Sequence, residues 1–143
     1  MTHSLTLHAF AFALTSRLLG APPGAASDAG NPLTPAASLQ CPPVPAPGRV
    51  LCTVEAQPGA GDSIQWGDFV IVSTSPSLSA LRGRIGPHEA TLREPSVWRW
   101  PFGLVARQAG QGVVEGRVRL VVCRASVCLP VELAVSATVV VGQ

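Results

Sequence analysis

The sequence contains no lysine, so all 10 of its basic side chains are arginines, and charged residues make up only 13% of the 143 residues. The arginines are scattered along the chain, and the net charge is +2. A nucleic-acid groove needs basic residues gathered in a stripe, with aromatic residues between them for stacking. The charge pattern therefore predicts that nucleic acid is not a partner.

Of the residues that favour helices, Lys is absent and Glu and Met are scarce. Gly and Pro number 14 each, and the apolar 47% of the chain is mostly Val, Leu and Ala. Many β-branched residues interrupted by Gly and Pro are typical of an all-β domain with many turns. The length fits one ordinary domain.

A membrane-spanning run is missing as well, since the apolar stretch from Leu5 to Leu14 is too short to cross a bilayer. Followed by the small residues Gly24-Ala25-Ala26, this stretch predicts a signal peptide over 1–26, although no Lys or Arg precedes it and Arg17 interrupts the apolar segment. The alternatives are an N-terminal extension without structure or a misassigned start. A signal peptide predicts a periplasmic or extracellular protein.

Residues 27–48 are rich in proline, with Ala, Gly and Ser between the prolines. Such a composition is typical of an extended or disordered spacer and predicts neither helix nor sheet. We therefore expect the folded domain to occupy residues 49–143.

Alternation of apolar and polar residues predicts strands over 50–56, 66–74, 104–107, 113–122 and 129–141. In the stretch 113–122, Val118, Leu120 and Val122 share one face, and Arg117, Arg119 and Val121 share the other. Trp98 and Trp100 are two residues apart, which places them on one face of an extended segment. Six or seven strands in about 95 residues favour an antiparallel β-sandwich of the immunoglobulin type.

Four cysteines are present, at positions 41, 52, 123 and 128, and three pairings are possible. Local pairing, Cys41 with Cys52 and Cys123 with Cys128, closes the smallest loops and is the arrangement we expect. Spacings of ten and four intervening residues fit a zinc site poorly, so no metal site is predicted. No cofactor is predicted either, because the Gly-Gln-Gly at 110–112 lacks the helix that a phosphate loop needs.

Cys123 and Cys128 end two predicted strands that a four-residue loop connects, so they face each other across a hairpin. Such a pair has two interpretations. A small, exposed bridge at a loop is suited to thiol exchange, and the neighbouring Arg124 is placed to favour a thiolate. Many secreted β-domains, however, carry local bridges that are purely structural.

The segment from Val114 to Cys123, followed by four residues and Cys128-Leu129-Pro130, resembles the N-terminal periplasmic domain of the thiol:disulfide interchange protein DsbD. The matching positions are Gly116, Cys123, Cys128 and Pro130, within about 30 residues. The resemblance implies an immunoglobulin-like fold. It also implies a thiol:disulfide interchange domain whose two cysteines cycle between dithiol and disulfide.

By the same resemblance, Cys128 forms the mixed disulfide with a partner and Cys123 resolves it. The implied partner is a thioredoxin-like protein or a membrane electron-transfer protein. The family shields its cysteines with an aromatic cap, for which the candidates here are Phe69, Trp98, Trp100 and Phe102. The alternative function is a secreted structural or protein-binding β-sandwich with inert disulfides.

Overall fold

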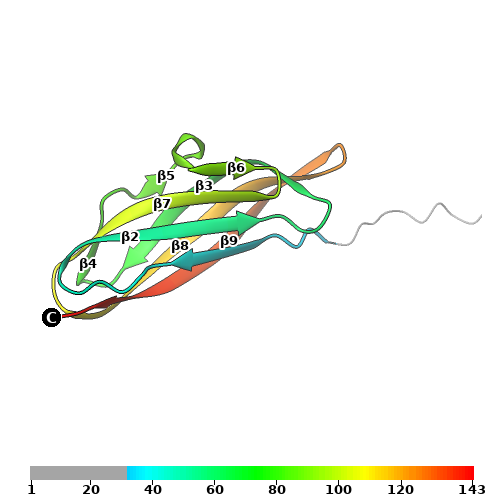
Figure 1. Cartoon of the computed structure of the whole chain (residues 1–143). Helices are drawn as coiled ribbons and strands as arrows, with labels where there is room; N and C mark the ends of the chain where they lie inside the picture. Colours follow the sequence, from blue (N-terminus) through cyan, green and yellow to red (C-terminus); the bar gives the residue numbers. More distant parts are fainter. Residues whose placement is uncertain (1–31) are drawn as a thin grey trace, which may run out of the picture. The chain divides into compact units, whose positions relative to one another are not determined.

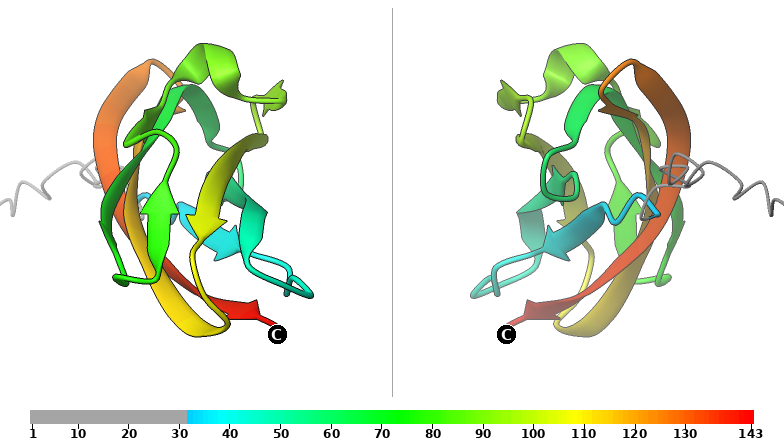
Figure 2. Two further views of the ribbon diagram at one scale, coloured as in Figure 1. Left: turned by 90° about the vertical axis from the view of Figure 1, so that its left-hand side faces the viewer. Right: turned by 90° about the vertical axis from the view of Figure 1, so that its right-hand side faces the viewer.

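The computed structural model describes residues 32–143, which form two antiparallel β-sheets packed face to face (Figures 1 and 2). The expected signal peptide lies outside the described residues. Within 32–143 the structure contains no α-helix and only one short 3₁₀ turn, η1. The elements in chain order are β1 (Ala36–Gln40), β2 (Gly48–Gln57), β3 (Ser63–Thr74), β4 (Leu78–Ala80), β5 (Arg84–Ile85), η1 (Pro87–Glu89), β6 (Leu92–Glu94), β7 (Val97–Ala106), β8 (Gly110–Arg124) and β9 (Val127–Val141).

One sheet has the order β1-β2-β7-β4, with β6 also paired to β7, and the other has the order β5-β3-β8-β9. β2 thus pairs with β7 in one sheet, and β3, β8 and β9 are neighbours in the other. The same arrangement is found in immunoglobulin-like sandwiches, where the second and fifth main strands pair in one sheet and the third, sixth and seventh lie in the other. The predicted fold class, an all-β immunoglobulin-like sandwich, is confirmed.

The core lies between the two sheets and follows the alternation expected from the sequence. Val118, Leu120 and Val122 of β8 are buried, whereas Arg117 is exposed on the opposite face. On β7, Trp98 and Trp100 are both buried and Arg99 between them is exposed. A pleated strand produces this pattern because successive side chains point to opposite faces.

The four aromatic residues considered for a cap over the cysteines all belong to this core. Phe69 and Trp100 are fully buried, and Trp98 and Phe102 are nearly so. Phe69 and Phe102 are in contact across the two sheets, with ring centroids 5.0 Å apart. The sequence could not separate a core position from a cap position, because both need an aromatic side chain in an extended segment.

The stretch expected to be a spacer contributes a strand. β1 lies within 27–48 and pairs antiparallel with β2, and Leu39 of β1 is buried in the core. This strand could not be predicted from the composition, because prolines lie on both sides of it. The described sandwich therefore includes residues before Arg49, which the sequence placed outside the domain.

Two further differences concern strand boundaries. The regions expected as an extended segment and a separate short strand form one continuous β7, which runs through Pro101. β6 and β4 pair with different parts of the same edge of β7, and Pro101 lies between these two parts. The missing N–H of Pro101 therefore interrupts neither the β6 ladder nor the β4 ladder. The short strands β4 and β5 lie between residues 74 and 87, where the sequence predicted no strand.

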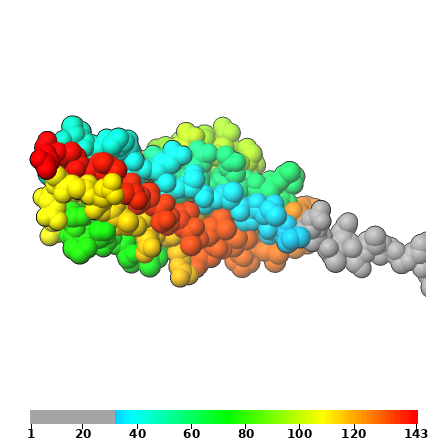
Figure 3. Space-filling view, turned by 90° about the horizontal axis from the view of Figure 1, so that it is seen from below, coloured from blue at the N-terminus to red at the C-terminus, as the bar shows by residue number. Residues whose placement is uncertain are grey.

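After β1 the chain crosses toward the second sheet. Val44 forms a parallel bridge with Val141, in which the Val44 amide donates to the Val140 carbonyl (3.0 Å) and the Gly142 amide donates to the Val44 carbonyl (2.8 Å). As a result, the segment containing β1 lies beside β9 along one side of the sandwich (Figure 3). No helix among the described residues is both long and apolar enough to cross a membrane.

Candidate functional site

Both predicted disulfides are formed, and the described residues contain no free cysteine. Cys123 and Cys128 are directly opposed in the β8–β9 ladder, with Cα atoms 4.0 Å apart. The structure therefore brings together the two residues on which the sequence-based prediction of the site rests.

The hairpin that carries this disulfide is tighter than expected. Arg124 pairs with Val127, so the turn consists of Ala125 and Ser126 alone, and not of four residues. Ala125 has φ = 51°, and a positive φ at the first turn residue is what two-residue hairpins need. This turn could not be predicted from the sequence, because Gly, Asn or Asp usually occupies such a position.

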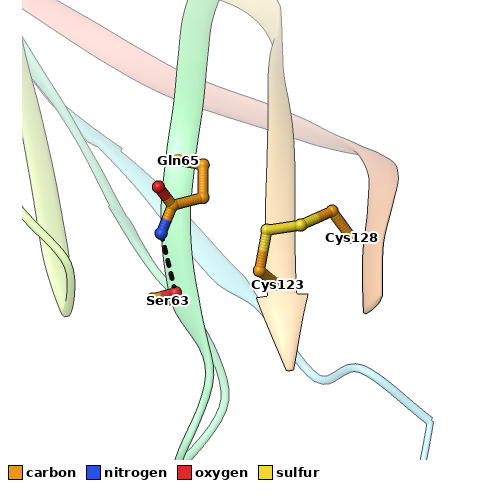
Figure 4. The surroundings of a disulfide bond; sticks show 4 residues. All are labelled: Ser63, Gln65, Cys123 and Cys128. Atoms are coloured by element: carbon orange, nitrogen blue, oxygen red, sulfur yellow. Dashed lines mark hydrogen bonds between the residues drawn. A yellow bond between two sulfur atoms is a disulfide. The ribbon is translucent and has the colours of Figure 1, made fainter. Parts of the chain in front are cut away.

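The disulfide lies on the outer face of the second sheet (Figure 4). Cys123 is only 7% exposed, whereas Cys128 is exposed. Ser63 of β3 lies opposite Cys123, and its hydroxyl accepts a hydrogen bond from the Gln65 amide (3.0 Å). The side chains at the neighbouring positions of this face, Ser63 and Val121 among them, carry no charge, so none of them stabilises a thiolate through an opposite charge.

Arg124 points away from this face, because its position in β8 alternates with that of Cys123. Its guanidinium donates to both oxygens of the buried Asp62 carboxylate, from Nε at 2.7 Å and from Nη2 at 2.9 Å. The hydrogen bond from Arg124 lowers the pKa of Asp62, against an opposing effect of burial. The charge of Arg124 is thus balanced by a carboxylate, and the expected activation of a thiol by Arg124 finds no support in this arrangement.

The two other residues that carry the resemblance have structural explanations. A Cβ atom on Gly116 would lie 2.3 Å from Cε2 of Phe69 and 2.7 Å from the carbonyl oxygen of Val70, so only glycine fits. Arg124 and Val127 close the two-residue turn, which makes the pair Val121 and Pro130 a non-hydrogen-bonded one. Pro130 therefore directs its missing N–H away from β8, as proline does on edge strands.

The second disulfide joins Cys41, at the end of β1, to Cys52 in the middle of β2, with Cα atoms 4.3 Å apart. Cys52 is fully buried and belongs to the core. This bridge fixes the C-terminal end of β1 to its neighbour, as the sequence predicted for a staple between the spacer and the first strand.

A polar cluster on the outer face of the second sheet was not predicted. Asp68 of β3 is fully buried and accepts hydrogen bonds from Nε and Nη2 of Arg119 (2.8 and 2.5 Å) and from Nε of Arg84 (2.6 Å). Burial raises the pKa of Asp68, but these hydrogen bonds outweigh it and keep the pKa below its usual value. The alternation of β3 places Asp68 on this face, yet its partners are 16 and 51 residues away in sequence, beyond the reach of any local pattern.

Beside this cluster the surface is hollowed into a depression of about 570 Å³. It extends over β3, β5, β8 and β9, and its lining includes Trp66, Arg84, Arg119, Val121, Pro130 and Glu132. Within residues 32–143, no group of three or more His, Cys, Asp or Glu side chains is arranged to hold a metal ion.

No family model matches the chain, and no curated protein matches it. Among solved structures, the bacterial hydrophobin BslA is similar, with 12% identity over 78% of this chain and 97% of BslA, at a TM-score of 0.37. AggA, the major subunit of aggregative adherence fimbriae type I from Escherichia coli, is similar with 7% identity over 76% of this chain and 95% of AggA, at a TM-score of 0.36.

Proposed function

We propose that this chain is an exported β-sandwich with a structural or protein-binding role, in which both disulfides are permanent staples. The observation that carries the proposal is the setting of Cys123 and Cys128. Cys123 is buried, the side chains facing it are uncharged, and the nearest arginine is bound to Asp62. Exchange depends on a stabilised thiolate, and this setting supplies no charge to stabilise one.

Export is supported by the disulfides, since such bonds persist in oxidising compartments and are rare in the cytosol. A periplasmic or extracellular location agrees with the signal peptide expected over 1–26. Gly116 and Pro130 add support for the structural role, because close packing and the edge-strand position account for both without any redox reaction.

The proposal is tested by incubating the oxidised protein with a thioredoxin at potentials near −270 mV, the approximate value for thioredoxin itself. We expect both disulfides to stay oxidised, as measured by alkylation of free thiols and mass spectrometry. The Cys123→Ser/Cys128→Ser variant should lose thermal stability and leave every redox assay unchanged. Rapid, selective reduction of Cys123–Cys128 would contradict the proposal.

A second candidate is the thiol-disulfide exchange implied by the resemblance to the DsbD N-terminal domain. It is favoured by one observation, the exposure of Cys128 at the end of the sandwich, where a partner has access. A thiolate of a thioredoxin-like protein, or of a membrane electron-transfer protein, attacks the Cys128 sulfur and Cys123 leaves as a thiolate. A second thiolate of the same partner then attacks the mixed disulfide, so that the partner is oxidised and Cys128 is released reduced. In the opposite direction the Cys128 thiolate attacks a disulfide of the partner, and Cys123 resolves the mixed disulfide, so that the partner is reduced and Cys123–Cys128 is formed.

Trapping distinguishes the two candidates. With Cys123→Ala, Cys128 has no internal partner, and an exchange module accumulates a mixed disulfide with a thioredoxin-like protein. The matched control is Cys128→Ala, which leaves only the buried Cys123. The staple proposal expects no specific adduct from either variant, and exchange expects one from Cys123→Ala alone.

A further inference from the structure

The depression on the outer face of the β5-β3-β8-β9 sheet combines two rows of side chains from the same three strands. Trp66, Val121 and Pro130 are directly opposed across β3, β8 and β9 and form an apolar row. Asp68, Arg119 and Glu132 form the charged row next to it. A volume of about 570 Å³ lies within the range of ligand sites in proteins.

Two arginines at the charged row have guanidinium donors that make no hydrogen bond within the described residues. Arg119 uses Nε and Nη2 to bind Asp68, and Arg84 uses only Nε. Among the described residues, Nη1 of Arg119 and both Nη atoms of Arg84 have no partner. The two side chains are 42% and 57% exposed, so these donors are accessible to a ligand.

The charges around the depression sum to one excess positive charge. Arg84 and Arg119 contribute two positive charges, and the buried Asp68 carboxylate balances one of them. Glu132 is bound to Arg117, so that pair is neutral. A ligand that supplies one negative charge and hydrogen-bond acceptors therefore complements the charged row.

The two guanidinium groups are also held in place before any ligand arrives. Asp68 is fully buried and fixes both arginines, which lowers the entropy that the arginines lose on binding. Planar guanidinium groups suit carboxylates, with which they form paired charge-assisted hydrogen bonds. Trp66 is half-buried in the adjacent row, and tryptophan and arginine are the side chains most often found at the energetic centre of protein interfaces.

We propose that this depression binds a carboxylate that lies beside an apolar side chain on the surface of a partner protein. The carboxylate binds the free Nη atoms of Arg84 and Arg119, and the apolar side chain packs on Trp66 and Pro130. This inference rests on the protein-binding role proposed above and identifies the surface and the ligand chemistry.

A titration of the oxidised, ¹⁵N-labelled full chain with N-acetylphenylalanine tests the inference, because this probe has one carboxylate beside one aromatic group. We expect shifts at the Trp66 indole N–H and at the backbone amides of Val121 and Val131. The neutral probe N-acetylphenylalaninamide should bind about tenfold more weakly, since a charge-assisted hydrogen bond contributes on the order of 1.5 kcal/mol or more.

Two variants and a control locate the site. Arg84→Gln should weaken binding of the carboxylate probe about fivefold or more, and Asp68 keeps both hydrogen bonds from Arg119 in this variant. Trp66→Leu should weaken both probes. Arg107→Gln is the control, because it removes the same charge from an exposed arginine that follows β7 of the other sheet.

Equal binding of the acid and the amide would overturn the inference, and so would equal weakening by Arg84→Gln and Arg107→Gln. Sulfate that shifts the same amides at the same concentration would also overturn it, because the apolar row would then play no part. Such failures leave the thioredoxin and thermal-stability tests of the staple proposal unaffected, so the two proposals fail separately.

Discussion

The two disulfides of this chain have the same chemistry in different settings. Cys41–Cys52 ties the end of a five-residue strand to the fully buried middle of β2. Cys123–Cys128 joins two 15-residue strands that are paired along their whole length. The first bridge thus reinforces a ladder of five residue pairs, and the second reinforces a ladder of 15.

The contribution of a disulfide to stability is therefore not evident from how its cysteines stand out in the sequence. The Cys123–Cys128 pair stands out because its cysteines flank a hairpin and resemble a redox motif. The Cys41–Cys52 pair lies partly in a proline-rich stretch, yet it joins the residue after β1 to the buried middle of β2. The following predictions test this contrast, in order of decreasing effect.

Removal of the first bridge should have the largest effect. Cys41→Ala/Cys52→Ala opens a loop with a sequence separation of 11, which corresponds to about 3 kcal/mol of unfolding free energy by loop entropy. We also expect β1 to lose some protection from hydrogen exchange, because its ladder with β2 has only five residue pairs. Urea unfolding and exchange measured by NMR provide the two readouts. Unchanged protection of β1 would show that the ladder suffices.

Removal of the second bridge should lower the unfolding free energy less than removal of the first. Cys123→Ser/Cys128→Ser opens a separation of 5, for which the same estimate gives roughly 2 kcal/mol. The β8–β9 ladder should persist, so amide shifts should change only near the hairpin. A loss equal to or larger than that of the Cys41→Ala/Cys52→Ala variant would contradict the contrast between the two bridges.

Acid should weaken the hairpin through its ion pair. The hydrogen bond from Arg124 lowers the pKa of Asp62 in the folded state, so the stabilisation is complete above the pKa of Asp in the unfolded chain, about 3.9. It is lost as the pH falls through the lower folded value. Asp62→Asn should therefore be less stable than the native chain at neutral pH, and the two should converge in strong acid, as measured by urea midpoints. Glu94→Gln, at an exposed carboxylate, is the control.

The smallest effect should come from the turn. Ala125 adopts a positive φ that costs an L-residue about 1–2 kcal/mol, and glycine removes that cost. Glycine also loses more chain entropy on folding, by about 0.5–1 kcal/mol. Ala125→Gly should thus raise the unfolding free energy by roughly 0.5 kcal/mol, both in the native chain and in the variant without Cys123 and Cys128. A decrease would show that the backbone of Ala125 is unstrained.

Much of the fold could be predicted because local patterns encode it. Alternation identified β8 and β9 and the buried faces of both, and the spacing of the cysteines identified both bridges. β1 was missed because the surrounding prolines dominate the composition of its stretch, whereas its pairing with β2 is a long-range property. The two-residue turn was missed because an alanine occupies a position that favours glycine.

The site was less predictable for a related reason. Cys123 and Cys128 are close in sequence, so a hairpin brings them together by local geometry alone. Asp68, Arg84 and Arg119 meet only after three strands have paired, and none of them belongs to a recognisable pattern. The burial of Asp68 and the exposure of Cys128 likewise depend on the assembled sheets.

The bridge between Cys41 and Cys52 has a mechanical consequence. In Figure 1 the described chain starts at one end of the sandwich and ends at the other, so a tension between Pro32 and Gln143 acts along the strands. On the N-terminal side the force passes from Cys41 directly to Cys52 in the core, and the ten residues between them cannot extend. On the C-terminal side it loads the β8–β9 ladder in shear, where many hydrogen bonds must break together. Such a tension would therefore be carried by a disulfide near one end of the described chain and by a ladder of 15 residue pairs at the other.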